Sequence, residues 1–245
     1  MQMTPDKKKN KLYIVVPCYN EEQVLGETSK RLKMKCEDLI QKGQISKDSK
    51  IVFVDDGSKD RTWKMISELH ETDPLFSGVK LSRNRGHQNA LLAGLTMASE
   101  HADMAISMDA DLQDDIDAVD EMIEKYYDGC DIVYGVRSAR ETDTFFKRFT
   151  AEAFYKLINK MSKADIVDGA RDFRLMSRQM TDAILEMGEY NRFSKGIFGW
   201  VGFRTKWLEY KNVERVAGST KWSFWKLFLY SLDGIVAFST APLSI

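Results

Sequence analysis

Short apolar runs alternate with segments of helical periodicity as far as Val136, and this alternation limits the folds open to the chain. Five runs have the length, apolar content and polar flanks of buried strands: Leu12–Pro17, Ile51–Asp55, Val79–Ser82, Met104–Asp109 and Asp131–Val136. Between them, apolar residues recur with the period of a helix in four segments: Glu21–Gln41, Thr62–His70, Gly86–Ser99 and Ile116–Tyr126. Repeated strand–helix units predict an α/β fold, with a mostly parallel sheet and helices on both faces.

Ligands of such sheets bind at the carboxyl ends of the strands, so the residues that follow each strand form the candidate site. Asp109 and Asp111 alternate directly after a buried strand, where two like charges are costly unless a cation pairs with them. Carboxylate oxygens suit Mg²⁺ or Mn²⁺, which commonly bridge protein carboxylates to substrate phosphates. These two residues therefore predict a divalent metal site, whereas Asp114 and Asp115 are better explained as caps of the next helix.

Composition and missing motifs exclude several other functions. Lys and Arg number 36 against 37 Asp and Glu, a balance that gives no basic footprint for nucleic acid. The sequence lacks GxGxxG, GxxxxGK[ST] and GxSxG, which disfavours a dinucleotide-dependent dehydrogenase, a P-loop NTPase and an α/β hydrolase. The 3 cysteines form no CxxC pair and the basic start has no signal-peptide core, so we expect reduced, inert thiols on the cytosolic side.

Four segments of the first half occur in the order IVVPCYNEE, IVFVDDGSKDRT, LSRNRGHQNALLAGL and SMDADLQDD. In this order and spacing they resemble the family 2 glycosyltransferases, which have the GT-A fold. The second half contains GVRSARETDTFFKRFTAEAFYKLIN, DGARDFRLMSR, NRFSKGIFGWVGF and ERVAGSTKWSFWKLFLYSLDGIVAFSTAPLSI. These segments resemble the polyprenyl-phosphate glycosyltransferases, the group of dolichyl-phosphate mannose synthases and their undecaprenyl-phosphate relatives.

The resemblance implies roles for individual residues. Residues that would line the nucleobase and ribose site are Pro17, Tyr19, Glu21 and Asp56. Residues that would surround Mg²⁺ or Mn²⁺ on the donor diphosphate are Asp109, Asp111 and Gln113. Residues that would bind the acceptor phosphate or the donor diphosphate are Arg137 and Arg148, with Asp172 near the acceptor. Residues that would close over the diphosphate as a mobile loop are Arg215, Ser219 and Lys221. His87 is explained more simply as the first residue of a helix than as a sugar contact.

The resemblance also implies an activity. The protein would move a hexose or N-acetylhexosamine, with inversion, from a UDP- or GDP-sugar to a polyprenyl phosphate, supplying glycan assembly from the cytoplasmic face of the cell membrane. It would bind no nucleic acid, and a homo-oligomer is possible. Two alternatives stay open. The acceptor could be a sugar hydroxyl of a polysaccharide, with Asp172 as the required general base, or the chain could be a non-catalytic nucleotide-sugar-binding module.

The expected organisation is one catalytic domain with short additions at each end. A basic disordered tail covers 1–10, and the GT-A domain covers 11–221, with a nucleotide-sugar half at 11–137 and an acceptor half at 138–221. Trp222 and Trp225 lie between Lys221 and Lys226 at the start of 222–245, which predicts an amphipathic segment at the membrane interface. Because the sequence stops on an apolar stretch without a polar tail, we expect transmembrane helices to follow it.

Overall fold

The computed structural model describes residues 9–137, 170–187 and 201–210. Residues 1–8 of the expected tail at 1–10 and the whole expected amphipathic segment at 222–245 lie outside these residues. Within them, no helix is both long enough and apolar enough to cross a membrane. The three cysteines, Cys18, Cys36 and Cys130, are buried free thiols, and burial raises the pKa of Cys36 to about 12. A buried thiol with a raised pKa is a poor nucleophile, which agrees with the prediction of inert thiols.

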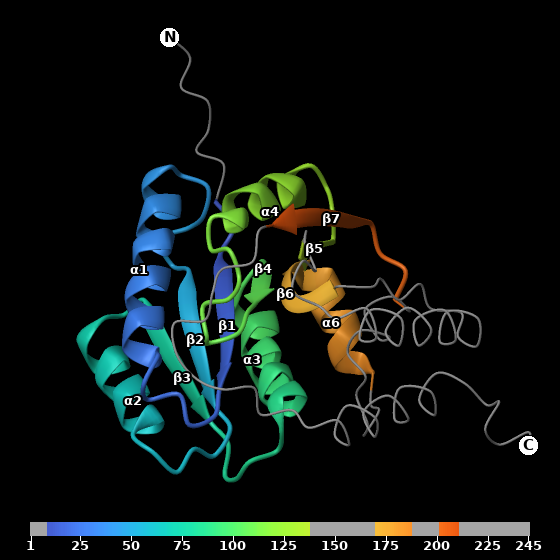
Figure 1. Ribbon diagram of the computed structural model, residues 1–245. Helices are drawn as coiled ribbons and strands as arrows, with labels where there is room; N and C mark the ends of the chain where they lie inside the picture. The colour runs from blue at the N-terminus through green and yellow to red at the C-terminus, as the bar shows by residue number, and fades with distance from the viewer. Residues whose placement is uncertain (1–8, 138–169, 188–200, 211–245) are drawn as a thin grey trace, which may run out of the picture.

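A seven-stranded sheet forms the centre of the molecule, in the order β3-β2-β1-β4-β6-β5-β7 (Figure 1). The strands are β1 (Leu12–Cys18), β2 (Lys50–Asp55), β3 (Phe76–Lys80), β4 (Met104–Ser107), β5 (Ile132–Arg137), β6 (Ala170–Ser177) and β7 (Thr205–Tyr210). Neighbouring strands are parallel except at β6, which runs antiparallel to both β4 and β5. The predicted mostly parallel α/β sheet is confirmed, and β6 brings the start of a late segment to the edge where β4 ends.

The third strand begins three residues earlier than the sequence predicts and ends at Lys80 instead of Ser82. Phe76 opens the strand because its buried ring stacks on Phe53 of β2, with 6.0 Å between ring centroids. Ser77 and Gly78 make the start of this strand hard to predict from the sequence, because neither residue favours a strand. Gly78 is nevertheless suited to the position, because a Cβ atom there would lie 2.6 Å from Ile66 of the covering helix.

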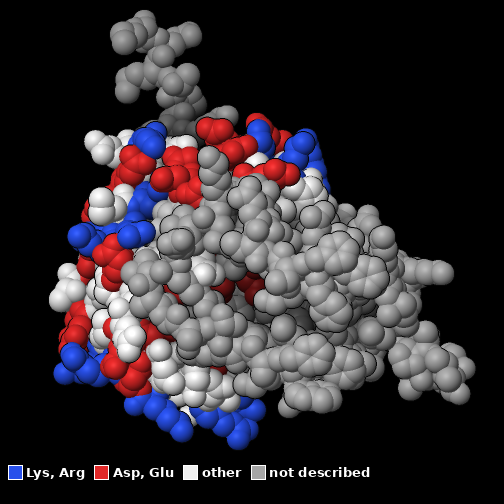
Figure 2. All heavy atoms as spheres, in the orientation of Figure 1, with Lys and Arg blue, Asp and Glu red and all other residues white. Residues whose placement is uncertain are grey.

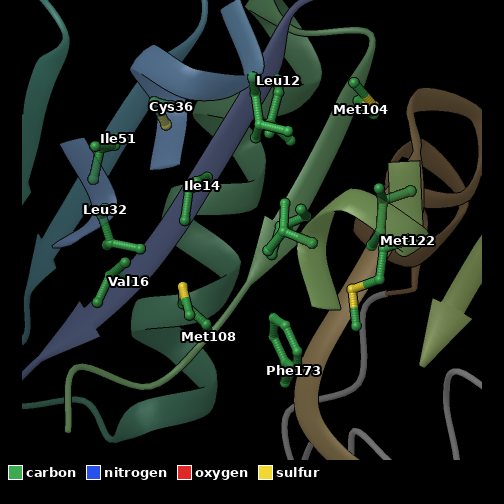
Figure 3. Packing of buried hydrophobic residues seen from close by; sticks show 14 of the residues in the cluster. Leu12, Ile14, Val16, Leu32, Cys36, Ile51, Met104, Met108, Met122 and Phe173 are labelled. Carbon is green, nitrogen blue, oxygen red and sulfur yellow. The ribbon is translucent and has the colours of Figure 1, made fainter. Parts of the chain in front are cut away.

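The helices cover both faces of the sheet. They are α1 (Leu25–Gln41), α2 (Thr62–Thr72), α3 (His87–His101), α4 (Ala118–Tyr127) and α6 (Arg178–Glu186). Alternation along β1 divides the core, because successive side chains of a strand point to opposite faces. Leu12, Ile14 and Val16 pack with α1, α2 and α4 (Figure 3), while Tyr13 and Val15 pack with α3 and α6.

Candidate active site

The loops that follow β1 and β2 are joined by reciprocal hydrogen bonds. The backbone N–H of Asn20 donates to the Ser58 hydroxyl at 2.9 Å, and the Asn20 side-chain oxygen accepts from the Lys59 N–H at 2.8 Å. The Glu21 N–H donates to the Thr62 hydroxyl at 2.9 Å. Half-buried Tyr19 therefore lies in a loop that hydrogen bonds to the loop after β2 hold in place. The nearby Pro17 is buried within β1, in register with Val54 of β2. Their predicted contact with a nucleobase stays a prediction.

Asp56 fixes the next loop of the same edge. Its carboxylate is only 2% exposed and accepts the backbone N–H groups of Arg85 at 2.6 Å and Gly86 at 2.9 Å. Gly57 has a φ of +68°, and a Cβ atom there would lie 2.5 Å from the carbonyl carbon of Arg83. Only glycine suits this position, because it tolerates both the left-handed backbone and the close approach. The predicted base-binding carboxylate thus holds the entry to α3 in place.

The segment after β4 alternates in exposure. Ala110, Leu112 and Asp114 are buried, whereas Asp109, Asp111 and Gln113 are partly exposed. The hydroxyl of Thr28, from α1, donates to the Ala110 carbonyl at 2.7 Å and anchors the segment from below. The predicted metal-binding trio therefore lies on the exposed side of the segment.

The expected helix caps are wrong in detail. α4 begins after Asp117, and no side chain caps its first turn. Asp115 accepts the Asp117 N–H at 3.0 Å, which gives it a turn-forming role just before the helix. Asp114 is only 3% exposed and its carboxylate lies 3.4 Å from the Asp109 N–H, so it faces the acidic segment instead of α4. Burial among the polar groups of this loop, which the sequence pattern could not reveal, accounts for the difference.

Asp172 reaches the same edge because β6 runs antiparallel to β4. Arg174 is in register with Ser107, the last residue of β4. The residues that precede Arg174 in β6 therefore extend past the end of β4. The Asp172 Oδ2 atom lies 3.3 Å from His87 Nε2 and accepts a hydrogen bond from Gln88 Nε2 at 3.2 Å. His87 Nε2 lies 3.7 Å from the Asp109 Oδ1 atom. One imidazole therefore joins the predicted acceptor-side carboxylate to the predicted metal-side carboxylate.

The acidic groups of this edge perturb one another. Burial, together with the charges of Asp114, Asp172 and Asp111, raises the pKa of Asp109 to about 6, against the opposing effect of His87. Burial lowers the pKa of His87, but the hydrogen bond that it donates to Asp172 and the charges of Asp172 and Asp109 outweigh this effect and raise the pKa to about 9. In Figure 2, acidic side chains are visible near the place where β4 and β6 lie close to α3 in Figure 1.

A cationic group lies directly behind Asp172. Arg174 is fully buried, its guanidinium forms an ion pair with Asp172 Oδ1, and it lies 5.4 Å from the ring centroid of Tyr134. Tyr134 is stacked in turn on Trp207 of β7, with centroids 4.3 Å apart and planes inclined by 14°. The sequence pattern did not identify His87, Tyr134 or Arg174 as site residues, although the spacing Asp172-x-Arg174 places two charges on one face of a strand.

The donor set fits a hard divalent cation in its chemistry. Asp109 and Asp111 supply carboxylates and Gln113 an amide oxygen, and Mg²⁺ is commonly held by one or two carboxylates plus substrate phosphates. In the described ranges, no three His, Cys, Asp or Glu side chains are arranged to hold a metal ion by themselves. Arg137 ends β5, in register with Tyr210. The remaining predicted site residues lie outside the described ranges: Arg148, Arg215, Ser219 and Lys221.

Solved structures share this fold. The chain superposes on mannosyl-3-phosphoglycerate synthase from Rubrobacter xylanophilus with a TM-score of 0.57, 14% identity and coverage of 93% of this chain and 72% of that one. It also matches a mannosyltransferase from Pyrobaculum calidifontis in complex with GDP-Man and Mn²⁺, with a TM-score of 0.55, 20% identity, and coverage of 86% and 58%. At these identities the likeness concerns the GT-A fold alone.

Sequence relatives are much closer. An uncharacterized glycosyltransferase of Bacillus subtilis, YkoT, is 48% identical over 232 residues, covering 95% of this chain and 68% of the relative. A prophage bactoprenol glucosyl transferase homolog of Escherichia coli K12 is 45% identical over 235 residues, covering 96% and 74%. The family model for glycosyl transferase family 2 matches residues 13–185. A match over this much of the chain, together with such relatives, shows that the chain belongs to glycosyltransferase family 2.

Proposed function

We propose that this protein transfers a sugar from a nucleotide-sugar donor to a polyprenyl phosphate. The observation that carries the proposal is the 43% identity, over 235 residues, to a bactoprenol glucosyl transferase of Shigella phage SfV, whose name states a polyprenol acceptor. The site agrees with it, because the predicted metal-side carboxylate Asp109 and the predicted acceptor-side carboxylate Asp172 meet at one edge of the sheet.

The donor would lie along the carboxyl edge, with its diphosphate at Asp109, Asp111 and Gln113. A bound Mg²⁺ or Mn²⁺ would neutralise the charge that grows on the departing nucleoside diphosphate. Solved family-fold proteins bind Mn²⁺, including the glucosyl-3-phosphoglycerate synthase of Mycobacterium tuberculosis, solved with Mn²⁺ and UDP. The fixed loops that carry Tyr19 and Asp56 would hold the nucleoside at the other end of the same edge.

A phosphate acceptor needs little help from a base. Its second pKa is near 6, so at pH 7 it is largely a dianion and already a nucleophile. One of its oxygens would form the new bond to the anomeric carbon while the bond from that carbon to the nucleoside diphosphate breaks, which inverts the configuration. Asp172 would orient the acceptor side of the site, since both of its oxygens are already engaged by Arg174, His87 and Gln88.

A sugar hydroxyl remains the alternative acceptor, because the contact between Asp172 and His87 at 3.3 Å resembles a general-base pair. The contacts of Asp172 disfavour it. Its Oδ1 atom is paired with Arg174 and its Oδ2 atom with His87 and Gln88, so an acceptor hydroxyl would compete with these partners for the carboxylate.

The proposal places the protein at the cytoplasmic face of the cell membrane, where a lipid-linked phosphate would be presented to it. The segment 222–245, whose Trp222 and Trp225 lie beside Lys221 and Lys226, would contact the membrane interface. Arg148, Arg215 and Lys221 would supply cationic groups, and Ser219 a hydroxyl, that bind the two phosphate-bearing substrates, as the family resemblance implies.

Purified protein tests the proposal directly. UDP- and GDP-sugars are incubated with Mn²⁺ and a short-chain polyprenyl phosphate, and products are separated and weighed by mass spectrometry. Parallel reactions contain the unphosphorylated polyprenol or an oligosaccharide. We expect one donor to yield a glycosylated lipid only when the polyprenol carries its phosphate. Transfer to the oligosaccharide instead would support the hydroxyl-acceptor alternative, and donor binding without any transfer would support a binding module.

The role of Asp172 separates the two acceptor chemistries further. Asp172→Asn keeps the shape of the side chain and removes its basicity. With a phosphate acceptor we expect a modest loss of rate that raising the pH does not restore. General-base catalysis is worth about 10²–10⁴-fold. A fall in kcat beyond about 10³-fold at unchanged KM would therefore restore Asp172 as the base.

A further inference from the structure

Arg174 is buried where packing alone does not require a charge. The residue is fully buried on β6 and lies on the face of the sheet that α3 and α6 cover, among Tyr134, Ile132 and Met176. Burying a guanidinium is costly unless it is paired, and an apolar residue of similar volume often replaces a buried ion pair without loss of stability. A charge retained at such a position calls for an explanation in the site that it faces.

The ion pair divides the two oxygens of the Asp172 carboxylate between different partners. Oδ1 binds the Arg174 guanidinium, and Oδ2 faces His87 Nε2 at 3.3 Å and Gln88 Nε2 at 3.2 Å. The backbone is fixed as well, because the Ser107 hydroxyl donates to the Asp172 carbonyl. With Oδ1 anchored from behind, the carboxylate plane cannot rotate, and Oδ2 is presented to the side of the site that contains Asp109.

Aromatic stacking supports the guanidinium from the other side. Tyr134 lies directly opposite Arg174 in the β5–β6 pairing, and its ring contacts the guanidinium at 5.4 Å. The opposite face of that ring stacks on Trp207, which is 39% exposed on β7. A cation on the face of an aromatic ring is stabilised most where water is excluded, so this stack helps a buried charge to hold one position.

We propose that Arg174 is a positioning residue, which orients Asp172 toward the acceptor side of the site and acts on the reaction only through that carboxylate. Trp207 on the edge strand β7 stacks on Tyr134, and Tyr134 contacts Arg174. These three side chains therefore connect the edge of the sheet to Asp172. The inference rests on the proposed function for its choice of acceptor, but the pairing itself does not depend on which acceptor is used.

Coupling between the two charges tests this role. Four proteins are compared: wild type, Asp172→Asn, Arg174→Met and the double variant. Methionine keeps much of the arginine volume without its charge. Misplacement of a site group by about 1 Å can cost about 10²-fold in rate, so we expect Arg174→Met to lower kcat about 10- to 100-fold, with donor KM little changed. If Arg174 acts through Asp172, the double variant loses no more than about twofold beyond the worse single variant.

Conservative and control variants separate positioning from general stability. Arg174→Lys keeps the charge but not the planar fork of donors, so we expect it to restore part of the lost kcat. Trp207→Leu removes the stack at a partly exposed position, and we expect a smaller fall in kcat in a folded protein. Arg178→Met is the matched control, because Arg178 is exposed at the start of α6, just past the far end of β6, where its Nε donates to the Ala102 carbonyl at 2.7 Å. It should keep the wild-type kcat.

Additive losses in the double variant, or a folded Arg174→Met protein with wild-type kcat, would overturn the proposal. If Arg174→Met does not fold, the Arg174→Lys and Asp172→Asn pair gives the same cycle. If the wild type transfers nothing to a polyprenyl phosphate, the proposed function fails. The cycle is then measured with the acceptor that wild type does use, or on metal-dependent donor hydrolysis, where additivity still refutes the positioning role.

Discussion

Replacing Gly94 by alanine would put a methyl group where the sheet leaves no room for it. An ideal Cβ atom at this position lies 2.3 Å from Val15 Cγ1 and 2.9 Å from Val54 Cγ2. Carbon atoms pack at about 3.5–4.0 Å, so α3 would have to move away from the sheet by about 1 Å. Both valines are fully buried on neighbouring strands, and β-branched side chains have few alternative rotamers. The strain therefore falls on the helix.

Two opposing effects set how much Gly94→Ala changes the free energy of unfolding. Overpacking a core typically costs about 1–3 kcal/mol, and contacts this short place Gly94→Ala at the upper end. Alanine regains about 1 kcal/mol of helix propensity over glycine, so the net loss should be about 2 kcal/mol. Gly26, in the first turn of α1, is the matched control, because a Cβ atom there has no neighbour within 4 Å. Gly26→Ala should stabilise the protein by about 0.5 kcal/mol.

Urea unfolding followed by circular dichroism measures both variants. Since α3 begins at His87, its displacement should also lengthen the 3.3 Å contact between His87 and Asp172. We therefore expect folded Gly94→Ala to lose transfer activity, while Gly26→Ala keeps it. A Gly94→Ala protein at least as stable as wild type would refute the packing of α3 on β1 and β2 that positions this side of the site.

Other expectations concern the metal, a charged contact between helices and a loop. Asp111→Asn should fold normally and weaken Mn²⁺-dependent donor binding in calorimetry, and unchanged affinity would contradict its assignment to the metal. Burial raises the pKa of Asp120, but hydrogen bonds from Lys35 and Lys42 outweigh this and lower it. Asp120→Asn should therefore cost about 1 kcal/mol at pH 7, and the difference should vanish as the pH falls below that lowered pKa. A difference that persists at low pH would count against the ion pairs. Nucleotide with Mn²⁺ should protect residues 214–222 from hydrogen exchange, and unchanged exchange would argue against a closing loop.

The strands and helices that carry strong periodicity could be predicted from the sequence. β1, β2 and α3 lie within two residues of their predicted bounds, because buried strands and an amphipathic helix leave clear patterns. The start of β3 could not be predicted, since Ser77 and Gly78 suit a strand only through the residues that pack against them. The place of β6 between β4 and β5 is a long-range pairing, which no local pattern encodes.

The acidic residues of the site could be predicted from the sequence for a similar reason. Asp109 and Asp111 follow a buried strand, and burial of Ala110 between them directs both carboxylates to one side. The role of Arg174 could not be identified, because its burial on β6 depends on two neighbouring strands, β4 and β5, and on two helices. In sequence, His87 is explained more simply as a helix start than as a sugar contact; in the structure it begins α3 and also contacts Asp172 and Asp109.

The nature of the new bond tests the central claim most directly. The product of a reaction with Mn²⁺, the preferred nucleotide sugar and a short-chain polyprenyl phosphate is examined by ³¹P nuclear magnetic resonance. Transfer to the acceptor phosphate converts a monoester into a diester, so we predict that the acceptor signal loses its titration near pH 6 and couples to the anomeric proton. An acceptor phosphate that still titrates as a monoester, with the sugar attached to a hydroxyl instead, would contradict the account.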